Sequence, residues 1–340
     1  MSPIPRARGY RRGRTGHGGG DLPTGWTTVK RTLVTGADGF TASHLLPLLR
    51  SGDRSQLFGT SLVSSPRAPL LDGIFVGDVL DDGFLRKVVR ETHPDRVYHL
   101  AAVVPVPLVR KDLPHALRVN VEGTYQLLEA LSDEAPEARL LIVGSSDEYG
   151  IRPREEMPLR ELDTFSPANG YGLTKVAQEL LGRQYHRERG LPVVFARTFN
   201  FTGPGQPADY VCASFARQVD ACRRKGGGTI RVGNLDVERD FLDIRDVVRA
   251  YKVLMDHGAT GGVYNVCSGE SVPLRRILDA LRAMAGVDIR VERDEARIRT
   301  VDIPYLLGDN TRLRSLGWER KYPLEETLRD LLRSLEGTAD

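Results

Sequence analysis

The chain has 340 residues, 40% of them hydrophobic, and a formal net charge of +3. Residues 1–30 carry +5, so the remainder carries −2 and is nearly neutral. A specific nucleic-acid partner is therefore not expected, because phosphate binding requires clustered positive charge on a folded surface. No stretch approaches the roughly 18 apolar residues of a membrane span, and the apolar content is sufficient for one large α/β unit or two modest domains.

The cysteines and the N-terminal segment indicate the compartment and the start of the fold. Cys212, Cys222 and Cys267 are odd in number and lack C-x-x-C spacing, so neither a disulfide framework nor a metal site is predicted. Cysteines of this number and spacing favour a reducing, cytoplasmic compartment. Residues 1–29 are rich in Gly and Arg without apolar periodicity, and we expect a disordered tail there.

From Lys30 onward the sequence alternates short apolar segments with helical ones. Strands are predicted at residues 31–36, 56–61, 74–78, 96–102, 138–146 and 191–198, and helices at residues 41–52, 84–94, 117–133 and 171–190. This alternation predicts an α/β fold of the Rossmann type, a doubly wound parallel sheet with helices on both faces.

The regularity loosens after the sixth predicted strand, and this change predicts two parts. We expect residues 30–200 to form a Rossmann domain that binds NAD(P). Residues 201–340 are expected to form a smaller α/β lobe, with short exchanges of chain back to the sheet. Ligands of open α/β sheets bind outside the carboxyl ends of the strands, so this lobe is placed to hold a substrate.

A glycine turn joins the first strand to its helix. Gly36, Gly39 and Ala42 form G-x-x-G-x-x-A, which permits a tight turn and lets backbone N–H groups meet a pyrophosphate. The context predicts a dinucleotide site, although a plain tight turn is the alternative. Asp78, after the third strand, is placed to accept a hydrogen bond from an adenine amino group. Further cofactor contacts are predicted for Phe40, Thr41, Val79, Leu100 and Ala101.

The end of the second strand bears on the choice of cofactor. An acidic residue there would bind the ribose 2′-OH of NAD, but Thr60 and Ser61 occupy the position and the nearest arginine is Arg67. The cofactor is therefore NADP(H) or NAD(H), and the missing acid favours NADP(H).

Tyr171 and Lys175 lie four residues apart at the start of a helical segment, so they share one face of the helix. A phenol with a pKa of about 10 is a poor base at neutral pH, and a neighbouring cation favours its ionised form. The spacing makes the pair a candidate catalytic dyad. Taken alone, Y-x-x-x-K equally describes two exposed residues on an ordinary helix.

Several motifs together indicate a family. TGADGF, HLAA, VGSSDEYG, YGLTK and RTFNFTGPGQ occur in this order, and residues 31–335 resemble the extended short-chain dehydrogenases/reductases that act on nucleotide sugars. VGNLDVERDFLDIRDVVRAY, GGVYNVCSGE and VDIPYLLGDNTRLR resemble the GDP-6-deoxy-D-mannose reductases in particular. The resemblance implies reduction of a GDP-linked 4-keto-6-deoxy-hexose. It also implies a homodimer in which helix 117–133 and the Tyr171 helix pair across a two-fold axis.

The resemblance also implies roles for individual residues. Tyr171 would exchange a proton with the sugar oxygen, while Lys175 would bind the nicotinamide ribose and lower the pKa of Tyr171. Ser146 would hydrogen-bond the reacting oxygen, with Ser145 as the alternative. Hydride would move between the nicotinamide and sugar C4.

The acidic pair Asp147 and Glu148 leaves the reaction open. In related nucleotide-sugar 4,6-dehydratases an acid at this place assists removal of water, so Glu148 is a catalytic candidate. A redox-neutral dehydratase or epimerase is therefore the alternative function, although reductases carry acids in the same loop and a solvated acidic loop is equally possible. A scaffold that binds NAD(P) without catalysis is the non-enzyme alternative, which the presence of Ser146, Tyr171 and Lys175 opposes.

The substrate residues follow from the same resemblance. Arg239 resembles the arginine that grips the nucleotide diphosphate, a task that suits a guanidinium fork. Arg299 matches a position at the nucleotide end and Asn200 one at the sugar diphosphate. Val232 is also assigned to the substrate site.

Two departures from the family pattern concern the sugar. Val103, Val104 and Pro105 stand where the family has polar residues, and this change removes hydrogen-bonding capacity from the sugar pocket. Gly170 replaces the proline that precedes the tyrosine, and we expect a looser entry into the helix. Together the departures predict an unusual nucleotide sugar as substrate.

Overall fold

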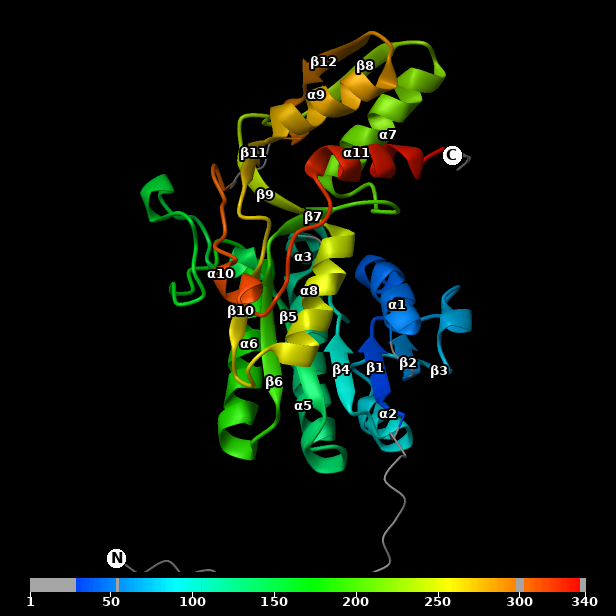
Figure 1. Cartoon of the computed structure of the whole chain (residues 1–340), viewed down its shortest axis with the longest axis vertical. Helices are drawn as coiled ribbons and strands as arrows, with labels where there is room; N and C mark the ends of the chain where they lie inside the picture. Colours follow the sequence, from blue (N-terminus) through cyan, green and yellow to red (C-terminus); the bar gives the residue numbers. More distant parts are fainter. Residues whose placement is uncertain (1–28, 53–54, 105, 298–302, 337–340) are drawn as a thin grey trace, which may run out of the picture.

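A seven-stranded parallel sheet forms the centre of the computed structural model, which describes residues 29–52, 55–104, 106–297 and 303–336 (Figure 1). Its strands are β1 (Arg31–Thr35), β2 (Gln56–Ser61), β3 (Gly73–Val76), β4 (Arg96–His99), β5 (Arg139–Ser145), β6 (Val193–Thr198) and β10 (Val263–Val266). They lie in the order β10-β6-β5-β4-β1-β2-β3, and every neighbouring pair is parallel. The predicted doubly wound sheet is confirmed. The seventh strand, β10, was not predicted.

Helices cover both faces of this sheet because successive strand residues point to opposite sides. In β5, Leu141 belongs to the core beneath α1 (Phe40–Gly52) and α8 (Ile244–His257). Its neighbours Leu140 and Ile142 belong to the core on the other face. That face is covered by α2 (Phe84–Thr92), α5 (Gly123–Glu134) and α6 (Gly170–Arg189). Near-continuous apolar runs, buried on both faces, are typical of parallel sheets.

Short elements precede α5 and follow β5. They are α3 (Val106–Lys111), α4 (Leu113–Leu117), the π-helical turn η2 (Arg118–Glu122) and the 3₁₀ turns η1 (Ala68–Leu70), η3 (Ser146–Glu148) and η4 (Arg154–Glu156). The predicted helix at 117–133 is therefore η2 followed by α5. The π-helical turn carries the buried Asn120, whose hydrogen bonds belong to the site described below.

The smaller lobe lies above the sheet in Figure 1. Its elements are α7 (Val211–Arg224), β8 (Gly228–Val232), α9 (Leu274–Ala285), β12 (Ile289–Arg293), η5 (Glu295–Arg297) and α11 (Leu324–Arg333). A three-stranded sheet of β7 (Asn200–Thr202), β9 (Glu238–Asp243) and β11 (Ser271–Pro273) joins the two parts, and α10 (Thr311–Arg314) packs near β10. Because α8 and β10 return to the large sheet, the chain after residue 200 contributes to both parts.

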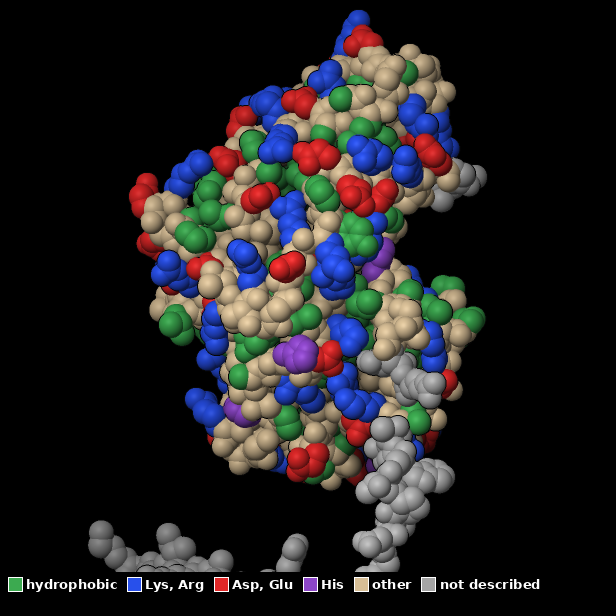
Figure 2. Space-filling view, in the orientation of Figure 1, with side chains coloured by type: hydrophobic (Ala, Val, Ile, Leu, Met, Phe, Trp, Pro, Cys, Tyr) green, Lys and Arg blue, Asp and Glu red, His purple; other side chains and the backbone are tan. Residues whose placement is uncertain are grey.

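The surface carries charges of both signs. Figure 2 shows acidic and basic side chains interspersed over the face that it draws. Among the described residues, none of the helices combines the length and apolar character that crossing a membrane requires.

Candidate active site

A cavity of about 1000 Å³ lies between the sheet and the lobe. The carboxyl ends of five strands border it, through Thr60, Gly36, His99, Ser145 and Thr198. This is the edge at which open parallel sheets bind ligands. The volume is at the upper end of the usual range for small-molecule sites, so it suits a cofactor and a substrate side by side.

The glycine turn forms the floor of one half of the cavity. Gly36 has φ +67°, and a Cβ at this position would lie 2.9 Å from the backbone nitrogen of Ala101. A side chain is therefore excluded for two reasons, the left-handed backbone and the close approach of the segment after β4. The turn and the start of α1 leave room for a pyrophosphate, so the residues present fit a dinucleotide.

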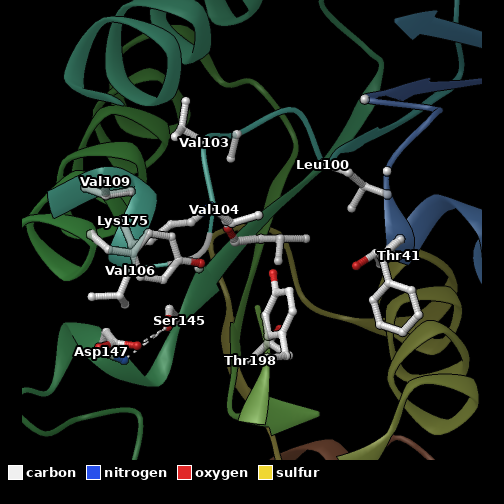
Figure 3. Close-up of a pocket in the computed structure, with 18 of the residues that line it drawn as sticks. Thr41, Leu100, Val103, Val104, Val106, Val109, Ser145, Asp147, Lys175 and Thr198 are labelled. Carbon is white, nitrogen blue, oxygen red and sulfur yellow. Dashed lines mark hydrogen bonds between the residues drawn. The ribbon is translucent and has the colours of Figure 1, made fainter. Parts of the chain in front are cut away.

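The other residues predicted to bind the cofactor surround this turn. Gly39, Phe40, Thr41, Asp78, Val79, Leu100 and Ala101 all line the cavity. Figure 3 shows Thr41 and Leu100 on the same side of it. Their contacts with a cofactor remain a prediction.

A buried chain of hydrogen bonds connects β1 with α5. His99 Nδ1 lies 2.8 Å from Thr35 Oγ1, and His99 Nε2 lies 2.9 Å from Thr124 Oγ1. Thr124 donates its one hydroxyl proton to the Asn120 carbonyl, so Nε2 of His99 must carry the proton and donate to Thr124. Burial lowers the pKa of His99 to about 3, which keeps the ring neutral and this tautomer fixed.

The chain continues from η2 to the helix that carries Tyr171. The Asn120 amide donates to Thr174 Oγ1 at 3.0 Å, and Thr174 donates to the Tyr171 carbonyl at 2.8 Å. Asn120 Oδ1 also accepts the Val103 N–H at 2.6 Å. Sequence reasoning missed His99, Asn120 and Thr174. The available signal was the occurrence of these polar residues within otherwise apolar segments.

Tyr171 and Lys175 face the cavity from the first turns of α6. Lys175 Nζ donates to the Val143 carbonyl at 2.9 Å and lies 5.7 Å from the centre of the Tyr171 ring. Burial lowers the pKa of Lys175 to about 8, while the charge of Glu148 opposes this shift.

The pKa of Tyr171 is raised well above its usual value, first by burial and then by the charge of Asp147. The lowering of this pKa by Lys175, which the resemblance implies, stays a prediction. Burial raises the pKa because it penalises the phenolate directly. A raised pKa keeps the phenol protonated.

The two serines differ in their surroundings. Ser145 caps η3: its hydroxyl oxygen accepts the Asp147 N–H at 3.1 Å and donates to the Asp147 carboxylate at 3.2 Å (Figure 3). The Ser146 hydroxyl has no hydrogen-bond partner among the described residues. Both serines line the cavity, so each is within reach of a ligand.

Asp147 fixes the entry into α6. Its Oδ1 accepts a hydrogen bond from Asn169 Nδ2 at 2.7 Å, and Asn169 Oδ1 accepts the Gly172 N–H at 2.8 Å as the helix N-cap. The looser entry expected from Gly170 is therefore not found. A Cβ at Gly170 would lie 2.7 Å from Leu113 Cδ1, so the missing side chain instead leaves room for Leu113.

Glu148 is not placed for proton transfer. Its side chain is fully buried, and Glu148 is not among the residues that line the cavity. Oε1 accepts the Ser145 N–H at 2.7 Å, while Oε2 lies 3.2 Å from Nε of Arg197. Arg197 also pairs with Glu179 of α6 at 2.9 Å. The prediction of a catalytic Glu148 is corrected: its carboxylate anchors the loop, and Asp147 is the acid that faces the cavity.

The predicted substrate residues divide into three groups. Asn200 and Arg239 line the cavity, and the buried Asn200 Nδ2 has no partner among the described residues, so it offers a donor to a ligand. Val232 ends β8 and packs in the core of the lobe, 3% exposed and away from the cavity lining, so its assignment is corrected. Arg299 lies outside the described residues.

Comparison with known proteins gives concordant matches. The family model for GDP-mannose 4,6 dehydratase matches residues 33–331. A GDP-6-deoxy-D-mannose reductase of Pseudomonas aeruginosa is 35% identical over 313 residues, 91% of this chain and 98% of that protein. A GDP-6-deoxy-D-talose 4-dehydrogenase of Aggregatibacter actinomycetemcomitans is 28% identical over 284 residues, 83% and 90% of the two chains. The solved structure of RMD from Pseudomonas aeruginosa complexed with NADPH has a TM-score of 0.79 at 32% identity, covering 91% of this chain and 99% of that one.

The parallel sheet, the glycine turn and these matches define an NAD(P)-dependent enzyme of the extended short-chain dehydrogenase/reductase class. Within that class, the chain belongs to the GDP-mannose 4,6-dehydratase family. The resemblance of the motifs predicted this relationship correctly.

Gly36 provides a test of the dinucleotide site. Gly36→Ala is expected to raise the Kd of NADPH at least about tenfold, because positive φ costs about 1–3 kcal/mol and the new methyl group meets the Ala101 backbone. Gly83→Ala is the matched control, since Gly83 has φ +75° with open space around its Cβ position. The Kd values are measured by fluorescence titration. Equal Kd values for both variants would contradict the assignment.

Proposed function

We propose that this enzyme reduces a GDP-linked 4-keto-6-deoxy-hexose at C4 with NADPH. The observation that carries the proposal is the meeting of Tyr171, Lys175 and two serines in one cavity beside the glycine turn. The names of the two relatives described above support a GDP-linked sugar. The carbonyl of such a sugar needs a proton donor, and the raised pKa of Tyr171 keeps a proton on its phenol at neutral pH.

Each of these cavity residues has a separate role in the proposed reaction. The bound nicotinamide supplies the hydride. Tyr171 holds the proton for the sugar oxygen, and one of the two serines hydrogen-bonds that oxygen and fixes its direction. Lys175 contributes a positive charge that favours the phenolate once the proton has left. Asn200 and Arg239 bind the diphosphate, with the guanidinium supplying charge-assisted hydrogen bonds.

A redox-neutral 4,6-dehydratase or epimerase is the second candidate. The observation in its favour is the Asp147 carboxylate, which lines the cavity next to Ser145. The two candidates differ in the balance of cofactor. A reductase oxidises one NADPH for each sugar, whereas a redox-neutral enzyme changes the sugar mass or configuration with no net change in NADPH absorbance.

We also propose a cytoplasmic homodimer. On α5 and α6, Tyr125, Leu173 and Leu180 are 45%, 47% and 50% exposed, and the two helices pack against each other. Exposed large apolar side chains on two neighbouring helices support pairing of these helices with a second copy. The three cysteines are free and buried, which supports a reducing compartment.

Tyr171→Phe tests the central assignment. The variant is expected to lower kcat for NADPH-dependent reduction by about 10² to 10⁴, because it removes the proton donor. The melting temperature should stay close to that of the wild type, since the described residues give the phenol oxygen no hydrogen bond to lose. A variant that keeps full activity would favour a scaffold or a different proton donor.

The two serines are separated by their structural roles. Ser146→Ala is expected to lower kcat while the melting temperature is unchanged, because its hydroxyl has no partner to lose. Ser145→Ala is expected to lower stability by about 0.5–2 kcal/mol as a lost cap. Steady-state kinetics and thermal unfolding of both variants provide the comparison. Loss of kcat in Ser145→Ala alone would transfer the catalytic role to Ser145.

Lys175 predicts a pH dependence. Its pKa is lowered to about 8, so the ammonium is lost as the pH rises through this value. The kcat/KM of reduction at saturating NADPH is expected to fall above about pH 8, by up to tenfold per pH unit. In Lys175→Arg the charge persists, so the fall should move to higher pH. An unchanged profile in that variant would assign the titration to another group.

Arg67 tests the preference for NADPH. Its guanidinium donates to the Asp38 carbonyl in the glycine turn, and Asp38 lines the cavity together with Thr60 and Ser61 of β2. Arg67→Ala is expected to raise the KM of NADPH about tenfold or more, since one hydrogen bond to a charged group contributes about 1.5–3 kcal/mol. The KM of NADH should stay unchanged. Equal losses with both cofactors would show that Arg67 only supports the turn.

A further inference from the structure

The cavity around Tyr171 has two chemically different sides. One side carries hydroxyl, carboxylate and amide groups, from Ser145, Ser146, Asp147 and Asn200. The segment from the end of β4 into α3 contributes Val103, Val104, Val106 and Val109, which we call the valine wall, and Arg110 and His115 further along also line the cavity. Figure 3 shows these four valines grouped around Lys175. Pro105 lies outside the described residues and forms no part of this definition.

The backbone of Val103, the first residue of the wall, is already hydrogen-bonded within the protein. The Val103 N–H is already donated to Asn120 Oδ1 at 2.6 Å, and the Val103 carbonyl accepts from Asn120 Nδ2 at 3.3 Å. Asn120 is fully buried and is held in turn by Thr174. The first residue of the wall is therefore fixed in place, with both of its backbone polar groups occupied.

The wall also continues as an apolar surface. Val109 is 1% exposed and anchors α3 from within, while Val104 is 38% exposed toward the cavity. Leu113 extends the surface to Gly170, where a missing side chain gives it room beside Tyr171. A ring hydroxyl that turned toward the valine side chains would lose its water without gaining a partner from them.

We propose that the substrate is a nucleotide-linked 4-keto-6-deoxy-hexose that also lacks a ring hydroxyl at C2 or C3 and turns this deoxygenated edge to the valine wall. The inference rests on the proposed function and adds the substrate class. The polar side of the cavity holds the C4 oxygen and the remaining hydroxyl. The deoxygenated edge loses only its contact with water when it meets the wall, which is favourable.

The test compares three GDP-linked 4-keto-6-deoxy-hexoses: the fully hydroxylated sugar, the 2-deoxy sugar and the 3-deoxy sugar. With NADPH, we expect kcat/KM for one deoxy sugar to exceed that for the hydroxylated sugar by about 10- to 100-fold, the range in which apolar pockets reject an added hydroxyl. Equal or higher kcat/KM for the hydroxylated sugar would overturn the inference while leaving the proposed function intact.

Isosteric substitutions test whether the valine wall causes the preference for a deoxy sugar. Val104→Thr exchanges a methyl group for a hydroxyl and is expected to reduce the preference at least several-fold, and Val106→Thr provides a second, independent substitution. The matched control is Val291→Thr, which makes the same change at 37% exposure on β12, away from the cavity. A preference that survives both wall substitutions would show that another surface selects the sugar.

A binding measurement separates failure of this inference from failure of the proposed function. The NADP⁺ complex cannot reduce a 4-keto sugar, so calorimetry can measure the affinity of all three sugars without turnover. If no sugar is reduced but a deoxy sugar binds at least tenfold more tightly, the reductase assignment fails and the substrate class stands. Equal affinities, or tighter binding of the hydroxylated sugar, would overturn the substrate class.

Discussion

The geometry of the site depends on a line of buried hydrogen bonds through His99 and Asn120. It begins at Thr35, behind the glycine turn, and ends at Thr174, one turn into the helix that bears Tyr171. Unpaired polar groups at such depth are costly, so each member holds its neighbour in one rotamer and one tautomer. The cofactor turn and the catalytic helix are thereby fixed relative to each other, although they lie far apart in sequence.

A buried cluster of three charged side chains fixes the loop that follows β5. Arg197 on β6 pairs with Glu148 in the loop and with Glu179 on α6. Removing one partner of such a cluster leaves an uncompensated charge, so the cluster couples the position of the serines to that of the helix. Gly144 belongs to the same arrangement, since a Cβ there would lie 2.2 Å from Glu148 Oε1. Glu148 therefore has a structural role in this loop.

The line of hydrogen bonds and the charged cluster are buried, so the side chains available to a ligand are those that line the cavity. Lys175 loses basicity and Tyr171 loses acidity through the same burial. The result is a protonated phenol beside an ammonium that titrates in the physiological range, a combination that suits reduction of a carbonyl. The valine wall adds an apolar part to a cavity that also carries polar groups. Its first residue, Val103, is held by Asn120, which also belongs to the line of buried hydrogen bonds.

The sequence by itself determined the parallel sheet, the glycine turn and the family, because each depends on local patterns of apolar residues, glycines and fixed motifs. It also placed Tyr171 and Lys175 on one helical face and identified the apolar segment at Val103. Only the tertiary structure decided that Glu148 turns away from the cavity. Whether Tyr171 gains or loses acidity was likewise decided there. These outcomes depend on burial and on charges from distant segments, and no local pattern contains that information.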